Sequence, residues 1–109
     1  MDTPIPLPVK RALKQLGHSL SLARRRRRMS QDMLAERIGA SVATVRRMED
    51  GYPGTALQHL ARALHVFGEL EKLNALLDTS TDEVGLALMD ERLPQRVRKP
   101  KRSDASGAL

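Results

Sequence analysis

The 109-residue chain contains no cysteine and no tryptophan, and its aromatic residues are limited to Tyr52 and Phe67. Without cysteine there is neither a disulfide framework nor a thiolate metal site, as is common in reducing compartments. No run of about 18 apolar residues occurs, and the N-terminus lacks the apolar stretch before a cleavage site that export requires. We therefore expect a cytoplasmic protein with no membrane partner.

The scarcity of aromatic residues also limits the fold class. Hydrophobic residues make up 40% of the chain, so burial depends on Leu, Ala, Val, Ile and Met, a composition that favours helices over sheets. The length suits one small domain. We predict an all-α protein.

Positive charge is concentrated in the part of the chain that is expected to fold. Residues 10–78 carry 13 Lys and Arg against 7 Asp and Glu, and five consecutive arginines occupy positions 24–28. Acidic residues precede basic ones in the C-terminal part, where residues 92–102 contain no acid. This distribution indicates a polyanionic partner. The basic tail could follow DNA, bind an acidic partner or keep the chain soluble.

Apolar spacing and capping residues predict five helices and a short sixth one that Gly85 weakens. We expect them at 9–27, between Ser30 and Gly39, between Ser41 and Gly51, between Thr55 and Gly68, at 69–77 and at 82–92. Pro4, Pro6 and Pro8 predict an extended arm over residues 1–8. The domain is expected over 9–78 and a C-terminal helix with a disordered basic tail over 79–109, with 94–109 lacking structure.

Two of these helices, separated by the short turn at Gly39, have the arrangement of a helix-turn-helix. Leu34, Ala35 and Ile38 are expected to be the buried side of the first, and Val45 and Met48 that of the second. A helix-turn-helix places its second helix in the DNA major groove, so DNA binding is the leading function.

Four leucines in the fifth segment exceed what a helix at the edge of a small domain needs to bury. We interpret them as a homodimer interface. These residues are Leu70, Leu73, Leu76 and Leu77.

The sequence offers no catalytic machinery. Its paired acids are neighbours in sequence and would point about 100° apart on a helix, and no glycine-rich phosphate loop or activated nucleophile is present. His18, His59 and His65 lack the spacing of metal ligands. Tyr52 is interpreted as a packing residue, because a single aromatic makes no stacking platform. We expect no enzyme activity, no cofactor and no metal.

One stretch of the sequence resembles the Xre/Cro family of phage-repressor-like DNA-binding domains. It contains Ser30-Gln31, Leu34-Ala35-Glu36, Ile38-Gly39, Thr44-Val45 and Met48-Glu49-Asp50-Gly51, and the likeness covers about residues 12–78. Within that family the chain is most similar to HipB-like antitoxins, partly through Leu86-Ala87-Leu88, Glu91-Arg92-Leu93-Pro94 and Arg96-Val97-Arg98.

The resemblance implies roles for individual residues. Phosphate contacts are implied for Ser30, Gln31 and Thr44, and the arginine run adds Arg27 and Arg28. Arg24 and Glu49 are implied to form a salt bridge between the first and third helices. Base reading is implied for Ser41, Val42, Ala43, Arg46 and Arg47, where geometry also expects it, and either arginine could pair with guanine. Asp50 departs from the family pattern, in which this position is often Asn or another residue that tolerates phosphate. A carboxylate near DNA is repulsive unless it faces away or caps the turn, so the resemblance implies no DNA contact for Asp50.

The resemblance also implies a five-helix phage-repressor-like fold and a function. The chain would be a homodimeric transcriptional repressor of a palindromic operator, and an antitoxin that autoregulates the operon of a HipA-like kinase toxin. The alternatives are a phage-type or chromosomal regulator without a toxin partner, and a protein-interaction module with a vestigial DNA face.

Overall fold

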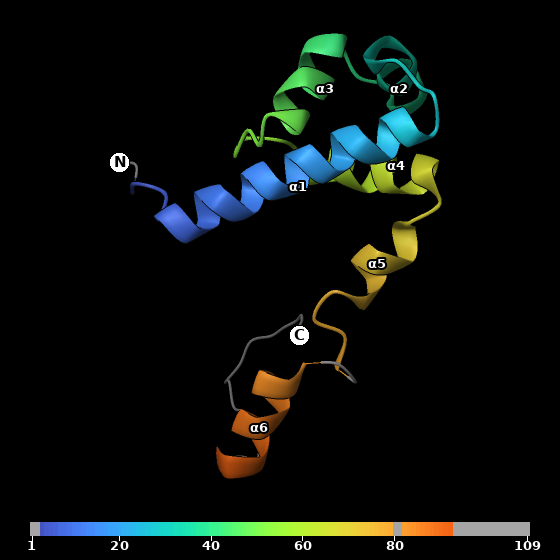
Figure 1. The fold of residues 1–109 in the computed structure, drawn as a ribbon. Helices are drawn as coiled ribbons and strands as arrows, with labels where there is room; N and C mark the ends of the chain where they lie inside the picture. Colours follow the sequence, from blue (N-terminus) through green and yellow to red (C-terminus); the bar gives the residue numbers. More distant parts are fainter. Residues whose placement is uncertain (1–2, 80–81, 93–109) are drawn as a thin grey trace, which may run out of the picture. The chain divides into compact units, whose positions relative to one another are not determined.

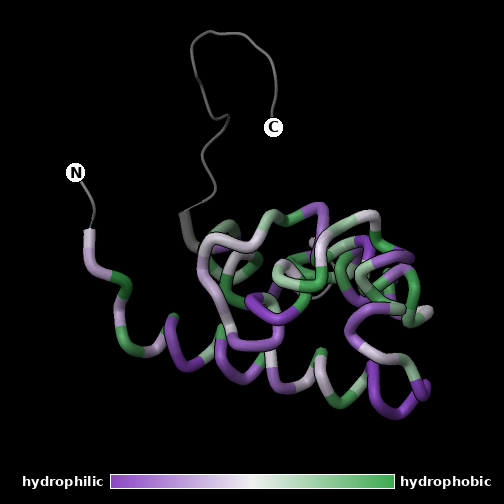
Figure 2. Tube along the Cα trace, turned by 90° about the horizontal axis from the view of Figure 1, so that it is seen from above, coloured by the Kyte–Doolittle hydropathy of each residue, from purple (hydrophilic) through white to green (hydrophobic). Residues whose placement is uncertain are grey.

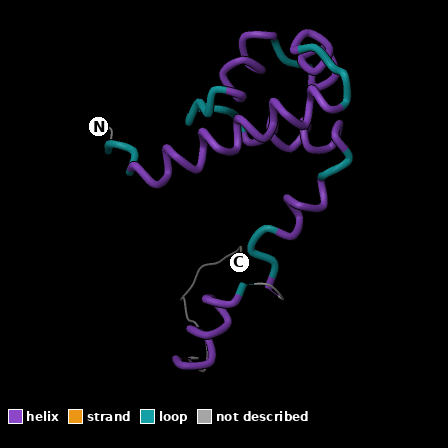
Figure 3. The backbone as a smooth tube through the Cα atoms, viewed as in Figure 1, coloured by secondary structure: helices purple, strands orange, loops and turns teal. Residues whose placement is uncertain are grey.

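The computed structural model describes residues 3–79 and 82–92, and this part of the chain consists of helices and loops without strands (Figures 1 and 3). The all-α prediction is confirmed. The described helices are α1 (Leu7–Arg26), α2 (Gln31–Ile38), α3 (Val42–Glu49), α4 (Leu57–Phe67), α5 (Leu70–Ala75) and α6 (Glu83–Arg92). None of the described helices has both the length and the apolar character needed to cross a bilayer.

The chain divides into two compact units, residues 1–74 and 75–109. The boundary lies near the end of α5, whereas the sequence predicted it after residue 78. The first unit contains α1 to α4 and most of α5, and the second contains α6. The predicted disorder of residues 94–109 lies outside the described residues.

Helix α1 begins two residues earlier than predicted, so the predicted proline arm over 1–8 is too long. Pro6 is the N-cap residue, and Pro8 falls in the first turn. Proline is tolerated there because the first amides of a helix have no intrahelical acceptor. Hydrophilic and hydrophobic residues alternate along α1 (Figure 2), as expected of a helix with one side against a core.

The caps of α2 and α3 agree with the sequence. Ser30 accepts a hydrogen bond from the amide of Met33, and Ser41 accepts one from the amide of Thr44, both at 3.1 Å. Gly39 ends α2 in the left-handed region at φ 70°, a conformation that glycine adopts without a steric penalty. Local sequence signals therefore define both ends of α2 and the start of α3.

Helix α4 differs from the prediction in its cap and in its buried side. Ala56, not Thr55, is the N-cap residue, and no side chain caps the helix. The helical spacing of Leu57, Leu60, Ala61 and Leu64 predicts an apolar stripe on α4, but these residues are only partly buried, and Leu57 is 68% exposed. Ala63 and Phe67 are the fully packed residues instead. The helix is therefore rotated relative to the predicted stripe.

The core of the first unit lies where α1, α2, α3 and α4 meet. Leu34, Ile38 and Val45 are the largest side chains that are almost completely buried, and they come from the predicted sides of α2 and α3. Helix α3 packs against both α1 and α2, and α2 packs against α4. The remaining buried apolar residues are Leu20, Met29, Ala35, Met48, Ala63 and Phe67.

The predicted fifth helix is shorter than expected, and the predicted sixth is present. Helix α5 ends at Ala75, so Leu76 and Leu77 lie beyond it, and Leu77 has a positive φ of 59°. At the start of α6, Asp82 accepts a hydrogen bond from the amide of Gly85 at 3.0 Å. A Cβ at Gly85 would collide with the Asp82 carboxyl group. Gly85 thus makes room for the cap.

Candidate nucleic-acid interface

A tight turn fixes α3 relative to α2. After Gly39, the amide of Ala40 donates to the carbonyl of Ala35 at 2.9 Å. Arg62 of α4 donates to the carbonyl of Ile38 at 3.2 Å, so one of the last carbonyls of α2 has a partner outside its own helix. The two helices are therefore held at a defined angle by backbone and side-chain contacts.

Helix α3 is short, and its solvent-exposed side carries two arginines. Val45 and Met48 are buried, Ala43 is partly exposed, and Arg46 and Arg47 are exposed. This exposure agrees with the predicted base-reading positions in all but one case. Val42 is half-buried and packs against the core, so it also supports α3 from the inside, and its base contact stays a prediction.

The predicted link between Arg24 and Glu49 is present. The Arg24 Nε donates to Glu49 Oε2 at 2.6 Å, and its Nη2 donates to Oε1 at 3.0 Å. A third donor, Nη1, reaches the carbonyl of Met29 at 2.8 Å. The two side chains are only 10% and 7% exposed. This fork-shaped pairing joins the end of α1 to the end of α3 in one orientation.

The environment of this pair keeps both groups charged. Burial raises the pKa of the Glu49 carboxyl group, but hydrogen bonds from Arg24 and Gln31 and the charge of Arg24 outweigh it, so the pKa lies below its ordinary value. The hydrogen bond to Glu49 raises the pKa of Arg24 despite its burial. The pair is therefore ionised at neutral pH.

The five arginines do not share one role. Arg24 is buried, and the other four, Arg25 to Arg28, are exposed. Arg28 adopts a positive φ of 57° in the loop before α2, a strained conformation for a residue with a side chain. It exposes a positive charge next to the start of α2.

Arg27 is instead committed to α4. Its Nη2 donates to the carbonyl of Phe67 at 2.9 Å, and its guanidinium lies 5.0 Å from the Phe67 ring centroid. A carboxylate oxygen of Glu69 lies 3.8 Å away. The predicted phosphate contact of Arg27 would have to replace these contacts, because its donors and charge already stabilise the C-terminal end of α4.

The predicted phosphate ligands Ser30, Gln31 and Thr44 have partners within the protein. Gln31 donates to Glu49 Oε1 at 3.0 Å. Ser30 and Ser41 cap their helices, and the Ser41 and Thr44 hydroxyls lie 3.1 Å apart. A serine or threonine hydroxyl has one donor and two acceptor sites. Ser30 and Thr44 can therefore still bind phosphate as predicted. The Gln31 side chain already donates to Glu49, so a phosphate would have to compete with that carboxylate for it.

Two residues that matter here were not singled out from the sequence for these roles. Gly17 of α1 is buried against the last carbonyls of α3. Tyr52, interpreted as a packing residue, is 48% exposed, and the Cζ of Arg47 lies 5.8 Å from its ring centroid. A glycine inside an otherwise regular helix was the available signal for Gly17. Nothing in the spacing indicated the Arg47 and Tyr52 contact.

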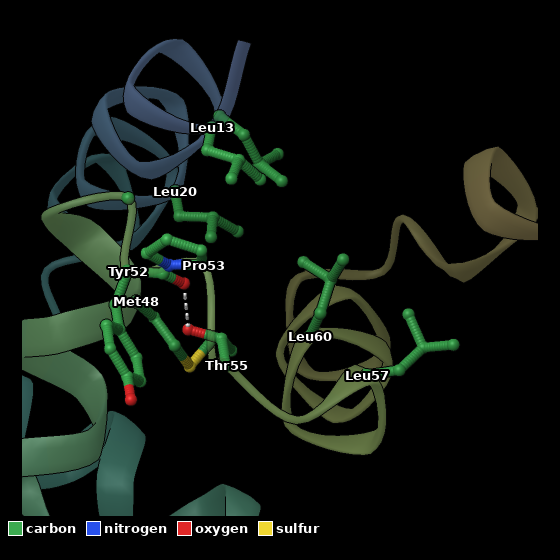
Figure 4. Close-up of a pocket in the computed structure, with 10 residues that line it drawn as sticks. Leu13, Leu20, Met48, Tyr52, Pro53, Thr55, Leu57 and Leu60 are labelled. Atoms are coloured by element: carbon green, nitrogen blue, oxygen red, sulfur yellow. Dashed lines mark hydrogen bonds between the residues drawn. The ribbon is translucent and has the colours of Figure 1, made fainter. Parts of the chain in front are cut away.

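An apolar hollow lies behind the loop between α3 and α4 (Figure 4). Leucines of α1 and α4 line it together with Met48 and Pro53. Among the residues that the structure describes, no cluster of His, Cys, Asp and Glu is suited to hold a metal ion. Arg46 and Arg47 of α3 are not among the residues that line this hollow.

Comparison with protein-family models, with curated proteins and with solved structures found no match to this chain.

Proposed function

We propose that α2, the Gly39 turn and α3 form a helix-turn-helix of the Xre/Cro type, and that the protein is a sequence-specific DNA-binding repressor. One observation carries this proposal. The short helix α3 buries Val45 and Met48, presents Arg46 and Arg47 to solvent, and is held to α1 by the Arg24 and Glu49 pair. A helix presented in this way suits the major groove.

The charge distribution supports the same partner. Arg25, Arg26 and Arg28 expose positive charge at the end of α1 and in the loop before α2. In a DNA complex such charges bind phosphates and orient the protein, while Arg46 and Arg47 read the bases. We propose guanine as the base that either arginine reads, through its N7 and O6 atoms.

The experiment is a binding titration with a labelled duplex that carries the DNA immediately upstream of the protein's own gene. We expect a dissociation constant of about 10⁻⁸ M or tighter, with an unrelated duplex of equal length bound far more weakly. Arg46→Ala combined with Arg47→Ala should lose this preference, at a cost of about 1–3 kcal/mol for each guanine contact.

A control with matched charge separates base reading from general attraction. Arg11→Ala combined with Lys72→Ala also removes two exposed positive charges, but both lie outside α2 and α3. This variant should keep the preference, and circular dichroism should show both variants folded. Equal losses in the two variants would reject base reading by α3. Equal binding of both duplexes by the wild-type protein would favour an interaction module with a vestigial DNA face.

We further propose that the repressor is a homodimer that binds a palindromic operator. Two copies of α3 would then enter successive major grooves about 34–36 Å apart. Leu70 and Leu73 on α5, in the first unit, are half-buried and leave part of their apolar surface for a second copy. Leu76 and Leu77 belong to the second unit and are exposed. Leu73→Glu should shift sedimentation towards the monomer. Leu57→Glu, at an exposed leucine of α4, should not.

The antitoxin role is a proposal that rests on the resemblance to HipB-like proteins. Exposed apolar residues of α6, namely Val84, Leu88 and Met89, offer a surface for a protein partner. Expression of the native operon with a tag on this chain should co-purify a HipA-like kinase. If no kinase is recovered at low or high salt while the operator is still bound, the chain is a phage-type or chromosomal regulator without a toxin partner.

A further inference from the structure

Of the two exposed arginines on α3, Arg47 has a ring contact with another side chain of the described residues, and Arg46 has no hydrogen bond, ion pair or ring contact of its side chain there. The Arg47 Cζ lies 5.8 Å from the ring centroid of Tyr52, within the distance at which a cation is attracted to an aromatic face. Before DNA is bound, the Arg47 side chain is therefore restrained by this contact, whereas no such contact restrains Arg46.

The backbone of Tyr52 is fixed on both sides. Its amide donates to the carbonyl of Arg47 at 2.9 Å. Its own carbonyl accepts from the Thr55 hydroxyl at 2.9 Å and from the Thr55 amide at 3.2 Å, and Figure 4 shows the first of these bonds. A backbone anchored in this way in the loop after α3 places the Tyr52 ring near Arg47, five residues earlier.

Gly54 leaves room for the ring itself. A Cβ at Gly54 would stand 2.6 Å from Cζ and from the hydroxyl oxygen of Tyr52, closer than real Cβ atoms approach other atoms. The ring therefore occupies the space that any other residue at position 54 would need. Tyr52 is nevertheless 48% exposed, so burial alone does not account for this arrangement.

We propose that Tyr52 is a positioning residue for base reading, because its ring holds the Arg47 guanidinium in a restricted orientation before DNA is bound. This inference rests on the proposed DNA-binding function. An arginine that forms a bidentate pair with guanine loses rotamer freedom. A side chain that the ring already restrains loses less, so Tyr52 increases the discrimination between the operator and other DNA.

The experiment measures that discrimination directly. The probe is the duplex with the highest affinity that the wild-type protein selects from a randomised library, compared with an unselected duplex of equal length. The discrimination ratio is the dissociation constant for the unselected duplex divided by that for the selected duplex. Tyr52→Leu should reduce this ratio about two- to fivefold. Tyr52→Phe, which keeps the ring and removes only the hydroxyl, should leave the ratio unchanged.

Gly54→Ala tests the same point without altering Tyr52 or Arg47. The nearest atoms to the added methyl group are at the far end of the Tyr52 ring, so the ring shifts while the fold is kept. We expect a loss of discrimination similar to that of Tyr52→Leu. Neither variant should lower the ratio further in a protein that already carries Arg47→Ala, because Tyr52 acts through that arginine.

A readout that is independent of DNA measures the contact itself. The ring current of Tyr52 should displace the proton resonance of the Arg47 δ-methylene group, and this displacement should disappear in Tyr52→Leu. Tyr52 is the only tyrosine, and Phe67 is the only other residue with a phenyl ring. The His59 imidazole also lines the hollow beside Arg47, so the part of the displacement that comes from Tyr52 is the part that disappears in Tyr52→Leu, where His59 is unchanged.

The outcomes separate this inference from the proposed function. An unchanged ratio or tighter binding in Tyr52→Leu would overturn the inference alone, as would a loss in Tyr52→Phe. A loss by Tyr52→Leu that persists beside Arg47→Ala would also overturn it, because the ring would then contact DNA itself. A wild-type protein that selects no duplex would overturn the proposed function and, with it, this inference.

Discussion

Gly17 of α1 lies directly against the carbonyl oxygen of Glu49 at the end of α3, where a Cβ on Gly17 would stand 2.5 Å from that oxygen. The two helices approach at this point with no side chain between their backbones. Gly51, in the loop after α3, makes a second close approach to α1, at the backbone of Leu13. The position of α3 is thus fixed by backbone contact as well as by the Arg24 and Glu49 pair.

Gly17→Ala should destabilise the protein. Replacing glycine by alanine inside a helix usually stabilises it by up to about 1 kcal/mol, but here the methyl group would force α1 and α3 apart, at a cost of about 1–3 kcal/mol. Chemical denaturation measures the free energy of unfolding. Ser19→Ala, on the exposed side of α1, is the control and should change little. A Gly17→Ala protein as stable as the wild type would contradict this packing.

Glu49→Gln should destabilise the fold by roughly 2–3 kcal/mol at neutral pH, because it leaves the buried Arg24 guanidinium without its counter-charge. The lowered pKa of Glu49 also predicts the direction in which stability changes with pH. The pKa of Glu49 is lowered in the folded state, so its contribution to stability is complete above its unfolded pKa, about 4.5, and is lost as the pH falls through the folded pKa.

The measurement is the free energy of unfolding as a function of pH in both proteins. Below pH 4.5 the wild type should lose stability more steeply than Glu49→Gln, and the two curves should converge. Parallel curves across the acidic range would show that the Glu49 carboxyl group is not the group that couples protonation to folding.

Arg28→Gly should separate stability from DNA binding. Glycine relieves the positive φ of 57° at this position, which should stabilise the fold by about 1 kcal/mol. The substitution also removes a predicted phosphate ligand. If a dimer neutralises on the order of eight phosphates, log affinity should fall with log salt at a slope near −7, and each phosphate that is no longer neutralised should make that slope shallower by about 0.9.

Arg27→Ala is the matched comparison within the same arginine run. It should leave the salt slope unchanged and lower stability by about 1–2 kcal/mol, because Arg27 holds the end of α4 through Phe67. If Arg27→Ala reduced the slope as much as Arg28→Gly, both arginines would bind phosphate, as the sequence predicts.

Much of the fold could be predicted because its determinants are local. Ser30, Ser41 and Gly39 act within a few residues of their own positions, and the apolar spacing around Ile38 and Val45 defines which side is buried. The salt bridge between Arg24 and Glu49 was implied by resemblance, since a separation of 25 residues gives no signal in the spacing.

The remaining features depend on contacts between distant segments. Leu57, Leu60 and Leu64 repeat at the helical period, but so do Leu60, Ala63 and Phe67, and only tertiary packing decides between the two stripes. Arg27 was assigned to DNA because its partner, Phe67, lies 40 residues away. The contact between Arg47 and Tyr52 depends on how the loop folds back after α3, which no periodic pattern encodes.

The most direct test of the account is to map, by amide chemical shifts of the isotopically labelled protein, which residues respond to the duplex selected from a randomised library. The account predicts the largest changes over residues 41–47 and near Ser30, with smaller changes at Ala63 and Phe67 in the core. Changes confined to α5 and α6, with residues 41–47 unaffected, would contradict the claim that α3 is the helix that enters the groove.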